Sequence, residues 1–277
     1  MIINKQEGQA LLVVVLVMIV ALTVGLSLTS RSIINLRTSS EEADSQRALA
    51  AAEAGIERSI QTNTSLSSLF SENNTTYSTV VTEAKGPGTF FVNGGNLILQ
   101  DDGADIWLVP HIDNADGSST PNYTSPWAGT SIDIYWGTAS NDCDNAAIEV
   151  SVILYDSNLT PPYKLKRYAY DPCALRNISN NFKDTISLGP YLVEDKNLKY
   201  KASITIASGL VARVVPIYAS TLLAIKGNGA GLPTQGFTND ATGTSGSGER
   251  QVVRRILYFK TYDQLATQYF NYGLFSP

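Results

Sequence analysis

The longest apolar segment of the chain lies almost at its N-terminus. Between Glu7 and Arg31 no residue is charged, and positions 10–28 are ALLVVVLVMIVALTVGLSL. A buried helix of a soluble protein normally keeps a polar stripe, which this segment lacks. At about 1.5 Å per residue it rises about 28 Å, close to the roughly 30 Å hydrocarbon thickness of a bilayer. The pattern predicts a membrane span over about residues 10–30.

The helical pattern continues beyond the apolar segment. Residues 31–61 contain no proline and are rich in Ala, Glu, Arg and Gln, all good helix formers. Spacings of three and four residues predict one apolar stripe along this part, formed by Leu49, Ala52, Ile56 and Ile60. We therefore expect one continuous helix over residues 9–61, lipophilic in its first half and amphipathic in its second.

Three interpretations of this N-terminal region compete. A cleaved secretory signal has an apolar core of about 7–15 residues that ends at an A-x-A site. Here the apolar run is longer, and the nearest Ala-x-Ala run lies far beyond it, around residues 48–52. The second interpretation is an ordinary single-pass anchor. The third interpretation depends on the continuation of the helix past the membrane.

After residue 61 the pattern changes to short apolar runs separated by turn residues. Residues 62–88 are polar and predict a loop, and the apolar runs on either side of Gly94 and Gly95 predict a hairpin. Alternation predicts further strands at 105–109, 131–136, 148–155, 164–170, 198–206 and 251–260, with a loop between the first two.

Three later segments complete the pattern. Residues 211–225 predict one apolar strand in which Pro216 marks an edge or a bend, and the Gly/Ser/Thr-rich residues 227–248 predict a long surface loop. An aromatic tail should pack on the domain, since disordered ends are poor in aromatics; its rings are Tyr269, Phe270, Tyr272 and Phe275. The expected fold class is α+β: a long N-terminal helix packed on a large antiparallel β-rich domain over residues 62–277.

Composition narrows the functional classes. The net charge is −5 and the pI about 5.0, without a basic run outside the helix, which argues against a nucleic-acid-binding surface. With 14 Tyr and only 16% charged residues, the chain is typical of an extracytoplasmic β-rich protein.

Two cysteines flank one predicted hairpin. Cys143 and Cys173 are equidistant from position 158, inside the predicted turn, so they can face each other at the base of the hairpin. In a chain exported across a membrane, two cysteines so placed favour a disulfide over a metal site. The alternative is a pair of buried free thiols.

The remaining residues predict no catalytic centre and no cofactor. His111 is the single histidine, and neither a G-x-S-x-G nor a phosphate-binding loop motif is present. Acidic pairs around positions 101–105, 113–116 and 142–144 lack the spacing of a calcium loop and predict solvated loops. We therefore expect a protein that is not an enzyme. Asn-x-Ser/Thr triplets, for example at Asn122, Asn158 and Asn177, carry no prediction by themselves.

The N-terminal region resembles that of type IV pilins. The short leader MIINKQEG ends in Gly8, directly before the apolar helix, and the run from Ser45 to Gly55, SQRALAAAEAG, is similar to minor pilins of the PilX type. The resemblance covers about residues 5–60. It implies a leader over residues 1–8 and cleavage by a prepilin peptidase between Gly8 and Gln9, on the cytoplasmic side. It also implies a single-pass subunit of the inner membrane with its C-terminal domain outside, which later joins a surface filament.

The same resemblance implies the partners: other pilins through the helix, and the inner-membrane assembly platform. One position departs from the usual pattern, because Val13 stands where most pilins and pseudopilins have a glutamate, the fifth residue after the cut. A lipid-buried carboxylate needs a charged partner, and a subunit without one resembles the pseudopilin that caps a filament tip. We expect a structural minor pilin that is incorporated in, or primes, a type IV pilus, at or near its tip. The alternatives are a membrane-anchored adhesion protein and a minor pseudopilin of a type II secretion system.

Overall fold

The computed structural model describes residues 7–70, 74–114, 118–185, 187–246, 248, 251–266 and 268–271. The chain divides into two compact units, which are described separately. The first comprises Met1–Gly55, Ser67–Ser78 and Thr242–Arg255, and the second Ile56–Leu66, Thr79–Ala241 and Ile256–Pro277. With its long helix and its antiparallel sheets the fold is α+β, as the sequence predicts.

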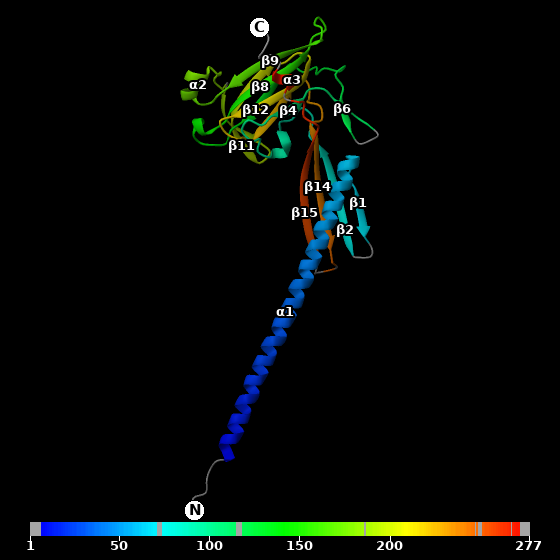
Figure 1. The fold of residues 1–277 in the computed structure, drawn as a ribbon, viewed down its shortest axis with the longest axis vertical. Helices are drawn as coiled ribbons and strands as arrows, with labels where there is room; N and C mark the ends of the chain where they lie inside the picture. The colour runs from blue at the N-terminus through cyan, green and yellow to red at the C-terminus, as the bar shows by residue number, and fades with distance from the viewer. Residues whose placement is uncertain are drawn as a thin grey trace, which may run out of the picture. The chain divides into compact units, whose positions relative to one another are not determined.

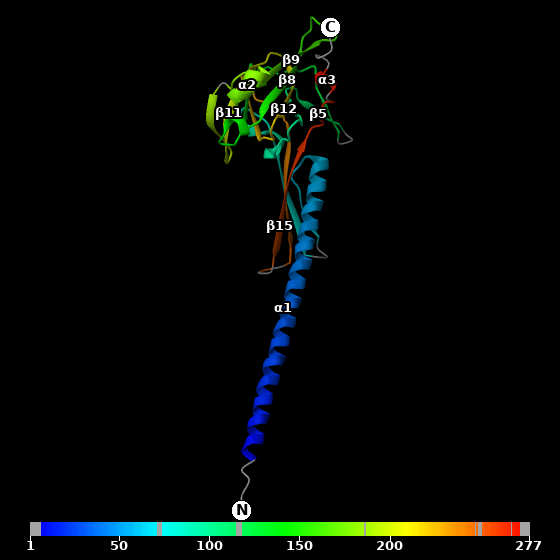
Figure 2. The same cartoon turned by 60° about the vertical axis from the view of Figure 1, so that its left-hand side comes forward.

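One continuous helix, α1, spans Glu7–Thr62 (Figure 1) and belongs to the first unit as far as Gly55. Its bounds agree with the predicted helix to within two residues at each end. A sheet of order β1-β2-β14-β15 accompanies its second half (Figures 1 and 2), with strands at Ser67–Phe70, Thr75–Glu83, Gly236–Ser245 and Val252–Thr261.

The helix face against this sheet carries small residues. The predicted stripe is wrong in part, because Leu49 is 42% exposed whereas Ala52 is buried. The buried positions of this face in the first unit are Ala48, Ala51, Ala52 and Gly55. Small side chains allow helix and strand backbones to approach closely, whereas the larger stripe of the prediction would hold them apart.

Two segments that the sequence predicts as loops are strands of this sheet. Residues 62–88 contain β1 and β2, paired antiparallel from Ser67 with Ser78 to Phe70 with Thr75. The predicted loop 227–248 contains β14, in which every second side chain is buried. Threonine, serine and glycine hide the alternation in both segments, because burial there selects small side chains rather than large apolar ones.

The second unit is a sandwich of two antiparallel sheets. One has the order β10-β11-β7-β13-β3 and the other β4-β12-β8-β9. The strands of the first span Ser187–Val193, Lys196–Thr205, Ser131–Trp136, Leu223–Asn228 and Phe90–Phe91; those of the second span Ala104–Trp107, Gly209–Ile217, Ala147–Tyr155 and Tyr163–Tyr170. The main core lies between the two sheets and includes the buried residues Trp136, Tyr200, Ile106, Ile148 and Val214.

The strongest sequence prediction in this unit is confirmed. β8 and β9 form an antiparallel hairpin whose register runs from Ile148 with Tyr170 to Tyr155 with Tyr163.

The single strand predicted over residues 211–225 is wrong. The segment forms two strands in different sheets: β12 ends at Ile217 and β13 begins at Leu223. Pro216 pairs with Ile148 of β8 but lies beyond the end of β4, so its missing N–H removes no hydrogen bond on the β4 side.

The hairpin predicted at Gly94–Gly95 is wrong. β3 pairs with β13, and residues 92–95 form the 3₁₀ turn η2 with left-handed backbone at Asn93 and Gly94. A Cβ on Gly94 would lie 2.6 Å from that of Phe259. The glycine therefore leaves room for the Phe259 side chain and does not form the turn of a hairpin. The predicted loop after β4 also holds a small hairpin of β5, His111–Asp113, and β6, Ser119–Pro121.

The C-terminal segment packs on the outer face of the sheet β4-β12-β8-β9. Phe270, in the short helix α3 (Gln268–Asn271), is buried in a cluster with Trp107, Val109 and Val211. Tyr269 is exposed, and Tyr272 and Phe275 lie outside the described residues. The prediction that the tail packs on the domain is confirmed at Phe270.

Candidate functional site

The first half of α1 exposes apolar side chains on all sides. Every large apolar residue from Leu11 to Leu36 is exposed, from 48% at Val15 to 71% at Leu11. Among the described residues, α1 is the one helix long and apolar enough to cross a membrane. A soluble monomer rarely exposes more than a few hundred Å² of contiguous apolar surface, and the length and composition of this helix match those of a membrane span.

The predicted cleavage positions lie at the start of this helix. Gly8 and Gln9 belong to the first turn of α1, and their side chains lie outside the described part of the structure, as do residues 1–6 altogether. Val13, the position that departs from the pilin pattern, is exposed. The structure therefore places the predicted cleavage positions directly before the exposed apolar surface.

Polar contacts fix the second half of α1 to the strands of its unit. Ser245 Oγ donates to Asp44 Oδ1 at 3.1 Å, and Arg254 donates from Nε and Nη2 to Ser45 Oγ at 2.9 and 2.6 Å. The strand backbone comes so close that a Cβ on Gly243 would lie 1.9 Å from the Ala48 carbonyl oxygen. These contacts belong to the helix segment that carries the pilin resemblance.

In the second unit, a lysine caps the C-terminal end of α1. Lys260 Nζ donates to the carbonyl oxygen of Ile60 at 2.8 Å and to Asn63 Oδ1 at 3.2 Å. The last carbonyls of a helix have no intrahelical partner and carry partial negative charge, so an ammonium group stabilises them.

Cys143 and Cys173 form a disulfide at the base of the β8–β9 hairpin. Their Cα atoms are 4.5 Å apart, and 30 positions separate them along the chain. Cys143 belongs to the turn η3, Asp142–Asp144, just before β8, and Cys173 directly precedes α2, Ala174–Asn180. The bond therefore joins the two chain segments that enter and leave the hairpin.

An arginine holds the same segments together. Arg176 forms a two-pronged ion pair with Asp171, at 2.9 Å from Nε and 2.7 Å from Nη2. Its guanidinium also donates to the carbonyl oxygens of Cys143 and Asn145 at 2.8 and 2.9 Å, and it lies 4.6 Å from the centre of the Tyr218 ring. One side chain thus satisfies four acceptors around the disulfide.

The Asp171 carboxyl shows the effect of these bonds. Burial acts to raise its pKa, but hydrogen bonds from Arg176, the Cys173 backbone N–H and Asn180 outweigh burial and hold the pKa below its usual range. Asp171 therefore stays ionised and keeps Arg176 in place.

A second, buried ion pair ties the C-terminal segment to the sandwich. Arg213 on β12 donates to Asp105 on β4 at 2.6 and 2.9 Å, and both side chains are almost fully buried. Asp105 also accepts from the Leu265 backbone N–H at 2.7 Å, and the Arg213 guanidinium lies 4.2 Å from the centre of the Phe270 ring. A buried charge must be paired and hydrogen-bonded in this way to be tolerated.

His111 lies in an aromatic cluster. Its ring stacks on Tyr262 with centroids 3.7 Å apart and meets the edge of Trp107 at 4.6 Å, while its buried Nδ1 has no hydrogen-bond partner within the described structure. Burial lowers the pKa of His111 to about 4, although the carboxylates of Asp113 and Asp263 act to raise it. The histidine is therefore uncharged at neutral pH.

The acidic pairs of the sequence are not gathered into a metal centre in the described residues, which hold no cluster of three or more His, Cys, Asp or Glu suited to a metal ion. Asp105 is committed to Arg213, and Asp142 pairs with Lys199 at 2.6 Å. Asp116, of the pair at 113–116, lies outside the described residues.

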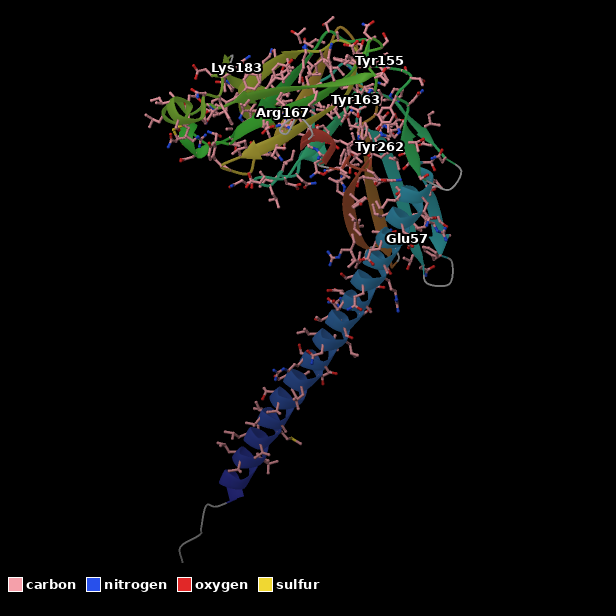
Figure 3. All side chains as sticks on the ribbon, turned by 45° about the horizontal axis from the view of Figure 1, so that its top comes forward. Glu57, Tyr155, Tyr163, Arg167, Lys183 and Tyr262 are labelled. Atoms are coloured by element: carbon pink, nitrogen blue, oxygen red, sulfur yellow. A yellow bond between two sulfur atoms is a disulfide. The ribbon has the colours of Figure 1, made fainter. Side chains whose placement is uncertain are left out.

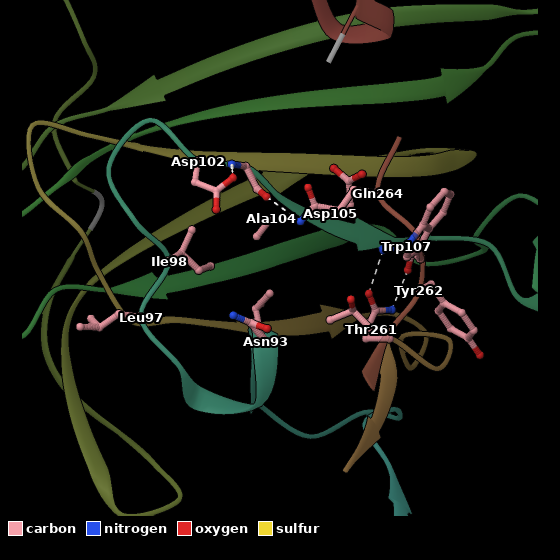
Figure 4. A pocket seen from close by; sticks show the side chains of 13 residues that line it. Asn93, Leu97, Ile98, Asp102, Ala104, Asp105, Trp107, Thr261, Tyr262 and Gln264 are labelled. Atoms are coloured by element: carbon pink, nitrogen blue, oxygen red, sulfur yellow. Dashed lines mark hydrogen bonds between the residues drawn. The ribbon is translucent and has the colours of Figure 1, made fainter. Parts of the chain in front are cut away.

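A small polar cavity of about 90 Å³ lies beside β4 (Figure 4). The Gln235 side chain lines it, accepting from the Trp107 N–H at 2.8 Å and donating to the Trp107 carbonyl at 2.7 Å, so it imitates a neighbouring strand. The cavity has room for a few water molecules, whereas pockets for drug-sized ligands measure about 300–1,000 Å³.

Sequence reasoning missed both arginine centres. Arg213 stands in a segment whose apolar neighbours dominate the pattern, whereas Arg176 stands in a short helix rich in Asn and Ser; their carboxylate partners are Asp105 and Asp171. An isolated arginine within a buried apolar strand, as at Arg213, is the signal that could have indicated a buried acidic partner.

No protein-family model, curated protein or solved structure matches this chain.

Proposed function

We propose that this chain is a structural subunit of a type IV pilus-like filament, of the minor pilin kind, and not an enzyme. The observation that carries the proposal is the continuous helix α1, whose first half is apolar and exposed on every side while its second half is fixed to a sheet. A plain anchor needs only about 20 apolar residues, whereas this helix continues without a break to Thr62.

Such a helix suits two environments in succession. In the bilayer its backbone is satisfied internally and its apolar side chains meet lipid. In a filament the same side chains pack against neighbouring pilin helices, which replaces lipid contacts at little net cost, because lipid tails are as apolar as leucine. The proposed partners are therefore other pilins, the inner-membrane assembly platform and, before assembly, the membrane itself.

Processing follows from the same proposal. A prepilin peptidase cuts between Gly8 and Gln9 on the cytoplasmic side, and the C-terminal domain stands outside the inner membrane. The disulfide supports the outside location, because disulfides persist in oxidising compartments.

We also propose a position at or near the filament tip. Val13 supplies no carboxylate for the terminal amine of a neighbouring subunit, and an unpaired amine in a low-dielectric filament core would cost several kcal/mol. A subunit at the tip has no neighbour above it and avoids this cost. Immunogold label spread along the whole filament, rather than gathered at one end, would remove the tip proposal and leave the subunit proposal standing.

Cleavage by a prepilin peptidase in a membrane preparation is the experiment that tests the proposal. The full chain should lose residues 1–8, and Gly8→Val should abolish the cut. Gly25→Ala is the matched control in the same helix, because its added Cβ meets nothing within 4 Å, and it should be cut like the wild type. An uncut wild-type chain, beside a major pilin that is cut, would favour the anchored adhesion protein.

A further inference from the structure

The loop that joins β8 to β9 is exposed to solvent. Its last strand pair is Tyr155 opposite Tyr163, and the loop between them is exposed throughout residues 157–162. The turn is ordered by its own bonds: the Asp156 N–H donates to the Pro162 carbonyl at 3.0 Å, and the Leu159 N–H to the Asp156 carbonyl at 3.1 Å. The loop thus presents a defined conformation to the solvent.

Asn158 lies at the centre of this loop within the sequence Asp156-Ser157-Asn158-Leu159-Thr160. Its side chain makes only local contact, with Nδ2 donating to Asp156 Oδ1 at 3.2 Å. Asn-x-Thr is the acceptor triplet of N-linked glycosylation.

The structure separates this triplet from the others that it describes. Asn177 donates from Nδ2 to the Asp171 carbonyl at 3.1 Å and also to Asp184, inside α2 and next to the disulfide. Asn122 is half-buried, and its Oδ1 accepts from the Thr124 hydroxyl at 2.6 Å.

Two further triplets, at Asn63 and Asn74, are also engaged. Lys260 donates to Asn63, and the hydroxyl two positions after Asn74, that of Thr76, bonds to Thr244. Of the described acceptor asparagines, Asn74 and Asn158 are exposed, and at Asn74 the hydroxyl that completes the triplet is bonded to another strand, whereas the Asn158 side chain bonds within its own loop.

Apolar side chains surround Asn158 in solvent. Tyr155, Leu159 and Tyr163 are 40%, 42% and 52% exposed, and Figure 3 shows the two tyrosines side by side at the loop end of the hairpin. Flat aromatic faces beside an acceptor asparagine suit the apolar face of a sugar ring.

We infer that Asn158 carries an N-linked glycan. Asn158 Nδ2 forms a bond to C1 of the first sugar of a polyprenyl-diphosphate-linked oligosaccharide. The C1–O bond to the diphosphate breaks, and the lipid diphosphate leaves with the bonding electron pair. The amide proton passes to a base of the transferase. The first sugar then packs on Tyr155 and Tyr163.

This inference rests on the extracytoplasmic location in the proposed function, because the donor lipid is used outside the cytoplasm. The disulfide reports that location independently. Protein from its own cells is digested with chymotrypsin, which cuts after Tyr155 and Tyr163 and releases peptide 156–163, and the same sample is alkylated with and without reductant.

We expect paired cysteines together with a sugar mass on peptide 156–163. Asn158→Gln and Thr160→Ala should remove the sugar, and Thr160→Ser, which keeps the hydroxyl, should retain it. Paired cysteines with an unmodified peptide would overturn the glycan inference alone. Two free thiols with an unmodified peptide would overturn the location, and with it the proposed function. A sugar on Asn122 or Asn177 in place of Asn158 would contradict the selection by exposure.

Discussion

The close approach of α1 to β14 makes Gly243 the position where a single methyl group should do most harm in the first unit. A Cβ there would lie 1.9 Å from the Ala48 carbonyl oxygen and 2.6 Å from the Ala52 nitrogen, whereas ordinary contact begins at 3.4 Å. Gly243→Ala therefore requires helix and strand to separate by about 1.5 Å at this point.

The cost follows from the atoms involved. Both close neighbours are helix backbone, so no side chain can rotate away and the helix itself must move. Overpacking of this kind costs about 1–3 kcal/mol, to which the loss of close packing at Ala48 and Ala52 adds. Alanine gains about 0.5–1 kcal/mol over glycine within a strand, which offsets part of this. We expect a net loss of about 2 kcal/mol in the local stability of the helix–strand contact.

Hydrogen exchange of the full chain in detergent is the appropriate assay, because it reads local opening of α1. A loss of about 2 kcal/mol should speed exchange of the amides of residues 48–55 by about 30-fold. Gly88→Ala is the matched control, since its Cβ would meet nothing within 4 Å, and it should leave these amides unchanged. Wild-type protection in Gly243→Ala would refute the close helix–strand contact.

Four other perturbations have defined outcomes. Changing both Cys143 and Cys173 to serine opens a loop of 30 positions and should lower the free energy of unfolding by about 3–4 kcal/mol in urea titrations followed by tryptophan fluorescence; equal midpoints for variant and wild type would contradict this. Because the folded pKa of His111, about 4, lies below its unfolded value of about 6.5, stability should fall as pH drops from 6.5 to 4. Partial exposure reduces the full effect to about 1–2 kcal/mol; His111→Phe should flatten this part of the pH profile, and an unchanged profile would refute the assignment. Arg213→Met leaves the buried Asp105 carboxylate without its counter-charge and should cost about 3–5 kcal/mol, most of which a second change, Asp105→Leu, should restore; a double variant no more stable than the single one would count against the ion pair. Val13→Glu should let the protein enter the filament shaft, which immunogold labelling would show; increased tip labelling without shaft entry would contradict the role given to Val13.

The helix and the central hairpin could be predicted because each carries its own strong pattern. Apolar residues fill every face of the helix over residues 10–28, and helix formers without proline follow them. This pattern predicts one long helix, which the structure has. In β8 the strict alternation of Ile148, Val150, Val152 and Leu154 matches one face toward the sandwich core. The turn residues between β8 and β9 then set the register of the hairpin.

The errors have a common physical origin in long-range packing. β14 is a strand although it is rich in Gly, Ser and Thr, because only small side chains fit where Gly243 meets the helix backbone. The apolar run at Phe90–Phe91 pairs with β13, far along the chain, rather than across the adjacent Gly-Gly. Neither pairing can be predicted from the neighbouring sequence, because each depends on which distant segment lies beside the strand in the folded chain.

The residues of the candidate site also fall into those that the sequence could predict and those that it could not. Cys143 and Cys173 could be proposed from spacing, since the base of a hairpin is a local feature of the sequence, whereas Gly8 and Gln9 were proposed from the resemblance of residues 5–60 to pilins. The partners of Arg176 and Arg213 could not, because Arg176 of α2 bonds to the backbone of Cys143 in η3 and Arg213 of β12 bonds to Asp105 of β4, both far away along the chain. Asn158 was visible as a triplet, but its exposure relative to Asn122 and Asn177 became apparent only in the fold.

The most direct test of the central claim is the mass of the protein recovered from filaments sheared off the surface of its own cells. A filament subunit should be present in that fraction, with its N-terminus at Gln9 and residues 1–8 missing. The full-length chain confined to the membrane fraction and absent from filaments containing a processed major pilin would contradict the claim.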